Sequence, residues 1–260
     1  MALDLAYDRR GSGPPLVLLH PLGADRRVWA PVLERLAAER DTIAIDLPGF
    51  GASPVLEPGA GAPTPAALAV AVRAFVSEAL GVRSWHVAGN SLGGWVALAL
   101  ALDGAVESVS AIAPAGLWSA PLAPKPSLAR RGAQLASPVA GVAARIGPLR
   151  RAMLIGSVGH PDRVPPTAAA HLVRAYGHAP GFAAVNAAMR AGHFTDLGRI
   201  EVPVTLLWPE LDRLVGRPRR LPPHVRNVTL TDCGHIPMWD DAETVAEALL
   251  AGSAIAAGVR

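Results

Sequence analysis

A serine stands between two glycines in the stretch VAGNSLGGWVAL, residues 87–98. An apolar, strand-like run gives way there to a helical pattern, which predicts that Ser91 lies on a sharp turn between a strand and a helix. Glycine at positions 89 and 93 permits such a tight turn. A hydroxyl held in this way can attack a carbonyl carbon, although a serine that caps the helix would give the same pattern.

A serine nucleophile needs a base to take its proton and an acid to orient that base. His235, in the stretch DCGHIPMWDD, is the candidate base, and Asp212, in PELDRLVG, is the candidate acid. Each of the three residues follows a strand-like run. Because ligands gather at the carboxyl ends of parallel strands, we expect all three at one edge of a sheet. Glu210 is the closest rival for the role of the acid.

The elements that must position these residues alternate between strand and helix. Short apolar runs, typical of strands buried on both faces, are followed by stretches with helical spacing. This alternation predicts an α/β fold with a mostly parallel, twisted sheet and helices on both faces. The predicted strands lie in PPLVLLHPLG (14–23), DTIAIDLPGFG (41–51), WHVAG (85–89), ESVSAIAPAG (107–116), VPVTLLWPE (202–210) and VRNVTLTDCG (225–234), and the predicted helices in residues 30–39, 66–81, 95–104 and 242–252.

The alternation stops at about residue 118 and resumes at about residue 195, and the segments between have helical spacing without strand character. We therefore predict one core, residues 1–117 and 196–260, interrupted by a helical insertion, residues 118–195. The insertion holds nine Lys and Arg but a single acid, Asp162. We expect its arginines to face solvent. If they face a pocket instead, they would favour substrates with a carboxylate; the arginines concerned are Arg130, Arg131, Arg145, Arg150, Arg151, Arg174 and Arg190.

Five stretches of the chain, in this order and spacing, resemble the α/β-hydrolase superfamily. They are HPLG at 20–23, DLPGFGAS at 46–53, GNSLGG at 89–94, WPELDRLV at 208–215 and GHIPMWDDAETVAEALL at 234–250. The resemblance implies the α/β-hydrolase fold, and it implies that residues 118–195 form a helical cap over the active site.

The resemblance also implies the roles of individual residues. Ser91 would be the nucleophile, His235 the general base and then the general acid, and Asp212 the residue that orients the imidazole. The backbone N–H groups of Leu22 and Leu92 would form the oxyanion hole. An acyl-enzyme would form on the serine and be released by water.

Other polar residues in the matching stretches are assigned supporting roles. In the family, the aspartate at the position of Asp46 usually organises its loop, so we do not favour Asp46 as the triad acid. His20 is expected to form hydrogen bonds within the oxyanion loop and to support it. Cys233, the one cysteine, is expected to be a small buried residue and not a nucleophile, because no helix start or second histidine adjoins it.

A serine at position 91 argues against dehalogenases and epoxide hydrolases, which use an aspartate there. We favour a hydrolase of carboxylic esters whose partner is a small hydrophobic ester or acyl substrate, with Asn90, Trp118 and Ile236 as candidate contacts to it. The pair Asn90–Ser91 also resembles the Asn-Ser pair found in hydrolases that cleave carbon–carbon bonds in meta-cleavage products. Those enzymes usually have tryptophan where this chain has Ile236. A hydrolase-fold protein that binds a ligand without catalysis is the third alternative.

Composition excludes several other classes of function. The net charge is +3, but no dense basic run is interleaved with aromatic residues, so no nucleic-acid partner is expected. The longest apolar run, residues 95–102, is far shorter than the roughly 20 residues of a membrane span. A single cysteine fits a reducing compartment, and we expect a cytoplasmic protein. The histidines of the insertion form no cluster with acids or cysteines, so no metal is expected. Gly11-Ser12-Gly13 leads into a strand and not a helix, so there is no dinucleotide fingerprint, and no cofactor is expected. The oligomeric state stays open.

Overall fold

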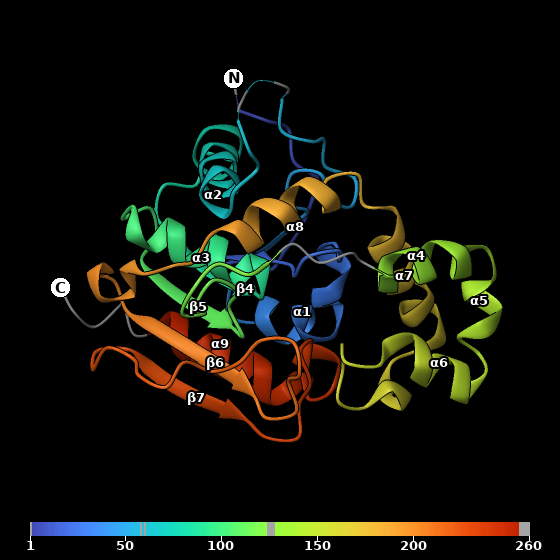
Figure 1. Ribbon diagram of the computed structural model, residues 1–260. Coiled ribbons are helices and arrows are strands. Elements are labelled where there is room, and N and C mark those ends of the chain that lie inside the picture. Colours follow the sequence, from blue (N-terminus) through green and yellow to red (C-terminus); the bar gives the residue numbers. More distant parts are fainter. Residues whose placement is uncertain (1, 58, 60, 124–127, 255–260) are drawn as a thin grey trace.

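The computed structural model describes residues 2–57, 59, 61–123 and 128–254, and a seven-stranded sheet forms the centre of this described part (Figure 1). The strand order is β1-β3-β2-β4-β5-β6-β7, in which β1 is antiparallel to β3 and every other neighbouring pair is parallel. The mostly parallel sheet predicted from the alternation is therefore confirmed. The strands are β1 Tyr7–Arg10, β2 Pro15–Leu19, β3 Asp41–Ile45, β4 His86–Asn90, β5 Ser108–Ile112, β6 Val204–Pro209 and β7 Arg226–Leu230.

The inner strands are buried on both faces, and the edge strands are not. Every residue of β3, β4, β5 and β6 is buried, which explains why these strands read as continuous apolar runs. The edge strand β1 has the sequence YDRR and is largely exposed. An exposed, charged edge strand carries no apolar pattern, so β1 was not predicted from the sequence.

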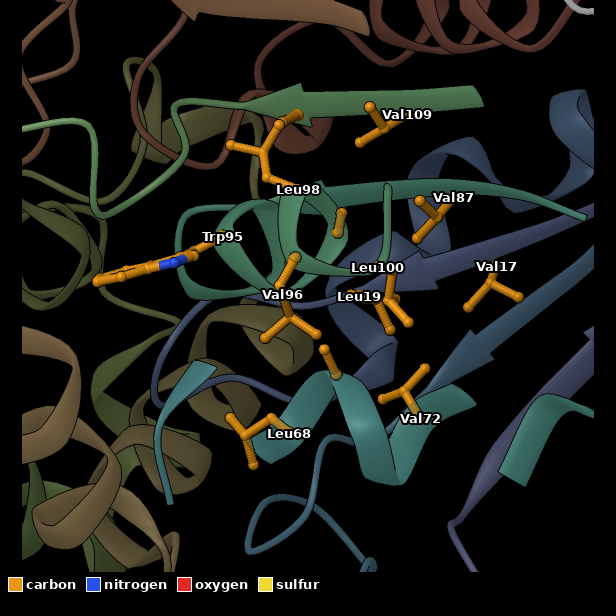
Figure 2. Close-up of a cluster of buried hydrophobic side chains, with 14 of the residues drawn as sticks. Val17, Leu19, Leu68, Val72, Val87, Trp95, Val96, Leu98, Leu100 and Val109 are labelled. Atoms are coloured by element: carbon orange, nitrogen blue, oxygen red, sulfur yellow. The ribbon is translucent and has the colours of Figure 1, made fainter. Parts of the chain in front are cut away.

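Helices cover both faces of the sheet. On one face lie α2 (Pro65–Ala74) and α3 (Leu92–Leu102), and on the other lie α1 (Ala30–Ala37) and α9 (Ala242–Ala254). Past Ala74, α2 continues as one π-helical turn, Phe75–Ala79. Figure 2 shows the cluster that joins α2 and α3 to the strands, formed by Leu68, Val72, Trp95, Val96, Leu98 and Leu100 with Val17, Leu19, Val87 and Val109.

The chain between β5 and β6 contains helices and turns but no strand in its described residues. The helices are α4 Leu128–Ala136, α5 Ala140–Ala143, α6 Gly147–Leu154, α7 Pro166–His178 and α8 Phe182–Ala191. Three residues of α8, Phe182, Val185 and Met189, belong to the same apolar cluster as the sheet. The insertion therefore shares the main core, and residues 118 and 195 stay predictions for its bounds. None of the described helices combines the length and the apolar character needed to cross a bilayer.

Candidate active site

Ser91 lies between the end of β4 and the start of α3, on a turn with unusual backbone angles. Its φ is 56° and its ψ is −112°, a region that residues other than glycine rarely adopt. A Cβ at Gly89 would overlap the carbonyl of Gly93, and a Cβ at Gly93 would overlap the carbonyl of Leu19, so neither position admits a side chain. The Ser91 side chain makes no capping hydrogen bond to α3. The hydroxyl therefore does not serve as a helix cap.

Asp212 and His235 are joined by a short hydrogen bond. Asp212 Oδ2 lies 2.7 Å from His235 Nδ1, and both side chains are buried. The other carboxylate oxygen of Asp212 accepts from the backbone N–H groups of Leu214 and Val215, at 2.7 and 3.2 Å. Burial by itself would raise the pKa of Asp212, but these hydrogen bonds, led by that from His235, lower the pKa below its ordinary value. An ionised Asp212 holds the proton on Nδ1 and leaves Nε2 as an acceptor.

The two rival acids have other partners. Glu210 is exposed, and its carboxylate accepts from the backbone N–H of Asp232 at 3.1 Å. Asp46 is fully buried and accepts from the backbone of Arg26 and Ala52, at 2.7 and 2.8 Å, as well as from the Arg26 guanidinium. Asp46 therefore holds a loop together, and of the three carboxylates Asp212 is the one in contact with the imidazole.

Asn90 connects the serine turn to the loop that carries His235. Its Nδ2 donates to the carbonyl of His235 at 3.0 Å and to the carbonyl of Ile112 at 3.1 Å. Asn90 is fully buried, so its side chain positions the histidine loop beside Ser91, which differs from the substrate contact expected from the sequence. In the described part of the chain the Ser91 hydroxyl forms no hydrogen bond to the imidazole. Catalytic hydrogen bonds are often long before substrate binds.

The backbone N–H groups of Leu22 and Leu92 have no acceptor among the described residues. Leu92 is the first residue of α3, where the N–H groups of a helix lack partners within it. The loop of Leu22 is fixed by His20, whose Nδ1 donates to the Pro21 carbonyl at 2.8 Å and whose Nε2 accepts from the Leu47 N–H at 2.9 Å. Complete burial lowers the pKa of His20, so the ring is neutral. His20 thus supports this loop, as the sequence indicated.

The remaining candidate contacts lie against protein groups. The indole N–H of Trp118 donates to the Gly192 carbonyl at 2.8 Å, and its ring packs edge-on against Trp95. Ile236 is buried in the apolar cluster beneath α1 and α9, and its N–H donates to the Ser157 carbonyl at 2.8 Å. Trp118, which is half-buried, thus retains some surface that a substrate could contact.

Asp240 was not singled out from the sequence, although it makes the densest set of contacts near His235. Its buried carboxylate accepts from the backbone N–H groups of Gly159 and Gly234 through Oδ2, at 2.8 and 2.7 Å, and from that of His160 through Oδ1, at 2.7 Å. Asp240 therefore ties the insertion to the residue that precedes His235. The only sequence signal was an acid pair, Asp240–Asp241, in which either member could have capped α9.

Several ionisable side chains of the insertion pair with carboxylates distant in sequence. His160 Nε2 lies 2.7 Å from Asp232 Oδ2, and His171 Nε2 lies 2.6 Å from Asp25 Oδ2. These pairs join the insertion to the core. The described residues contain no group of three His, Cys, Asp or Glu that could hold a metal. Cys233 is buried. Burial, and to a smaller extent the nearby carboxylates, raises the pKa of its thiol to about 12, so the thiol is unreactive.

A groove of about 430 Å³ runs between α4 and α8. Arg130, Arg131 and Arg190 line it together with Leu122 and Phe182. Of the seven arginines of the insertion that could face a pocket according to the sequence, three therefore line this groove. Two others, Arg150 and Arg151, pair with Asp162. The groove does not include Ser91 or His235, but Phe182 and Tyr176 lie against Gly23, directly after Leu22.

Known proteins share this fold over the whole chain. A bacterial membrane phospholipase A is 27% identical and superposes with a TM-score of 0.77 over 100% of this chain and 86% of that one. An esterase from Thermogutta terrifontis superposes with a TM-score of 0.71 at 23% identity, over 98% of this chain and 94% of that one, which shows the fold alone.

Curated relatives match over shorter stretches. The pimeloyl-[acyl-carrier protein] methyl ester esterase of Aeromonas salmonicida (strain A449) is 37% identical over 103 residues, which cover 38% of this chain and 37% of that protein. The dihydrolipoyllysine-residue acetyltransferase component of the acetoin cleaving system of Cupriavidus necator is 38% identical over 121 residues, 45% of this chain and 31% of that protein. The chain thus spans 37% of the length of the first relative and 31% of the length of the second.

The model of the alpha/beta hydrolase family matches residues 16–248, which include the serine turn, the Asp212–His235 pair and the whole insertion. The chain therefore belongs to the alpha/beta hydrolase family.

Proposed function

We propose that this hydrolase cleaves a carboxylic ester of a small hydrophobic substrate through an acyl-enzyme, with Ser91, His235 and Asp212 as its catalytic residues. The observation that carries the proposal is the Asp212–His235 hydrogen bond in a loop that Asn90 fastens beside the serine turn. A buried carboxylate on Nδ1 leaves Nε2 as the base that a serine nucleophile requires.

The reaction proceeds in two halves. Ser91 Oγ attacks the carbonyl carbon while His235 Nε2 takes the hydroxyl proton, and the N–H groups of Leu22 and Leu92 stabilise the oxyanion. The imidazolium gives its proton to the leaving alcohol as the carbon–oxygen bond breaks. Water, deprotonated by the same nitrogen, then releases the acid and restores the serine. Loss of one oxyanion donor typically costs about 10²–10³ in rate.

The comparisons support an ester as the substrate. A relative named as a methyl ester esterase is 37% identical over part of the chain, and the structure of a phospholipase A is similar over the whole chain. Both names describe the hydrolysis of esters. We extend that bond type, and not their particular substrates, to this protein.

We also propose that residues 118–195 act as a cap over the site. Three contacts support this role: Tyr176 and Phe182 lie against Gly23 of the oxyanion loop, Ser157 accepts from Ile236, and Asp240 binds Gly159. Each joins the insertion to a loop that carries a proposed catalytic group. We also propose that the protein acts in a reducing compartment such as the cytoplasm, because its single cysteine cannot form a disulfide within the chain.

A fluorophosphonate probe tests the nucleophile. We expect the wild-type chain and the variant Ser12→Ala, which alters an exposed serine, to be labelled, and Ser91→Ala to remain unlabelled. Equal labelling of Ser91→Ala would refute the assignment. A chain that neither reacts with the probe nor hydrolyses any ester would instead be a ligand-binding protein.

A substrate screen tests the bond type. We expect p-nitrophenyl esters of increasing chain length to be hydrolysed faster than a lactone or a meta-cleavage dienoate. A higher kcat/KM for the dienoate would favour the carbon–carbon hydrolase, the alternative suggested by the Asn90–Ser91 pair. In the structure Asn90 is buried against backbone carbonyls, so it does not by itself favour that alternative.

A further inference from the structure

Large apolar side chains in and next to α4, α5 and α6 are exposed to solvent. Of the twelve large apolar side chains exposed in the described part of the chain, seven lie between residues 128 and 155. Leu135 is 83% exposed, Ile155 is 78% exposed and Leu128 is 72% exposed. Scattered single apolar residues are normal on a protein surface, but a concentration of this kind marks a surface that contacts something. We call Leu128, Leu135, Val139, Val142, Ile146, Leu149 and Ile155 the outer cap face.

The packing of the insertion leaves these side chains exposed. The helices α4, α5 and α6 lie around α7 at one edge of the molecule (Figure 1). Their buried residues, Ala140 and Leu154 among them, form part of the apolar cluster that includes α7. α4 has no buried residue at all, so its leucines contribute nothing to the core. The outer cap face is therefore not required for folding of the insertion.

Arginines within and next to the helices of the outer cap face carry positive charge. Arg131, Arg145 and Arg174 are exposed, and within the described residues none of them is in ion-pair distance of a carboxylate. The one acid of the insertion, Asp162, already pairs with Arg151. A partner of this face must therefore accept both aliphatic side chains and unneutralised arginines.

These features select the chemistry of the partner. Residues 128–155 include no Phe, Tyr or Trp, the aromatic residues that, together with Met and Arg, are enriched at protein–protein interfaces. A second copy of the chain would bring the same positive charge against this face. Aliphatic side chains next to arginines match the boundary between acyl chains and anionic headgroups in a bilayer. No described helix is long and apolar enough to span that bilayer, so contact would be made at its surface.

We propose that the outer cap face docks reversibly on an anionic lipid surface, with its leucine, valine and isoleucine side chains among the acyl chains and the arginines at the headgroup phosphates. The proposal goes beyond ester hydrolysis and does not depend on it, because lipid binding needs no catalytic turnover. The proposed catalytic residues are not part of this face.

Flotation with lipid vesicles tests the docking, with the full chain as the sample. We expect binding to vesicles of phosphatidylcholine mixed with phosphatidylglycerol, weaker binding to pure phosphatidylcholine, and release at high salt. The double variant Leu135→Glu/Val142→Glu is expected to lower the partition coefficient by about tenfold or more. Arg145→Glu should lower it by about fivefold or more, since each positive charge near an anionic surface contributes about that factor.

Matched controls separate docking from general stickiness. Val70 is 63% exposed on α2, and Arg219 is exposed in the segment between β6 and β7. Neither residue belongs to the outer cap face, so Val70→Glu and Arg219→Glu should bind vesicles like the wild type. Melting temperatures confirm that each variant folds. Equal binding by all variants, or no preference for anionic vesicles, would overturn the proposal. The proposal would also be overturned if light scattering showed a dimer, if Leu135→Glu/Val142→Glu were a monomer, and if vesicles bound neither form. The outer cap face would then join two copies of the chain.

Discussion

Asp240 offers a direct test of how the insertion and the histidine loop are held together. Its carboxylate accepts three backbone hydrogen bonds, two through Oδ2 and one through Oδ1. In the variant Asp240→Asn, the amide oxygen can still accept the bonds from Gly159 and Gly234. The amide nitrogen then faces the N–H of His160, so that two donors oppose each other in a buried site.

The cost of this change follows from the hydrogen bonds lost. A hydrogen bond to a charged group contributes about 1.5–3 kcal/mol, and an unsatisfied buried donor costs about 1–3 kcal/mol. We expect Asp240→Asn to lower the free energy of unfolding by about 2–4 kcal/mol. For a chain of this size, that corresponds to a fall in melting temperature of roughly 5–15 °C. A looser histidine loop should also lower kcat/KM on a p-nitrophenyl ester by about 10–100-fold.

The neighbouring residue provides the control. Asp241 Oδ1 accepts from the Thr244 N–H at 3.0 Å, at the start of α9. Asparagine caps helices about as well as aspartate, so Asp241→Asn should change the free energy of unfolding by less than about 0.5 kcal/mol. Thermal and urea denaturation followed by tryptophan fluorescence measure both variants. If Asp240→Asn and Asp241→Asn have the same free energy of unfolding, Asp240 does not hold the insertion and the histidine loop together.

Three further predictions concern the acid, the serine turn and pH. Asp212→Asn should lower kcat by about 10⁴-fold because the imidazole loses its orienting acceptor, whereas Glu210→Gln should retain activity; the reverse order in a kinetic assay would identify Glu210 as the acid. Gly93→Ala should destabilise the fold by about 3 kcal/mol or more because the added Cβ would meet backbone atoms, whereas Gly132→Ala, with open space in α4, should stabilise it by about 0.5–1 kcal/mol. Urea unfolding measures both variants, and changes of the same sign in the free energy of unfolding would contradict this prediction. Burial lowers the pKa of His86 in the fold, so below about pH 6.5 the unfolded chain binds a proton that the folded chain does not. The free energy of unfolding should therefore decrease as the pH is lowered below about 6.5, by up to about 1.4 kcal/mol per pH unit. His86→Gln should flatten that dependence, and an unchanged slope in denaturation curves would show that His86 does not titrate in this way.

The sequence by itself determined the fold and the serine turn. Each buried strand shows as an apolar run because both of its faces are covered, and a helix that buries one face, such as α1, shows as a helical period. The glycines at 89 and 93 report the close backbone approach that Ser91 requires. These signals are local, since each depends on residues within a few positions of one another.

Tertiary structure alone decided which polar groups meet. Asp212 and Glu210 are two residues apart in one loop, and only the folded chain brings the first to the imidazole and the second to the backbone of Asp232. The burial of Asn90 against two carbonyls, and the three bonds of Asp240, likewise join segments distant in sequence. A side chain of one type serves equally well as a cap, a clamp or a catalytic group. Its partner, which the local pattern does not encode, sets the role.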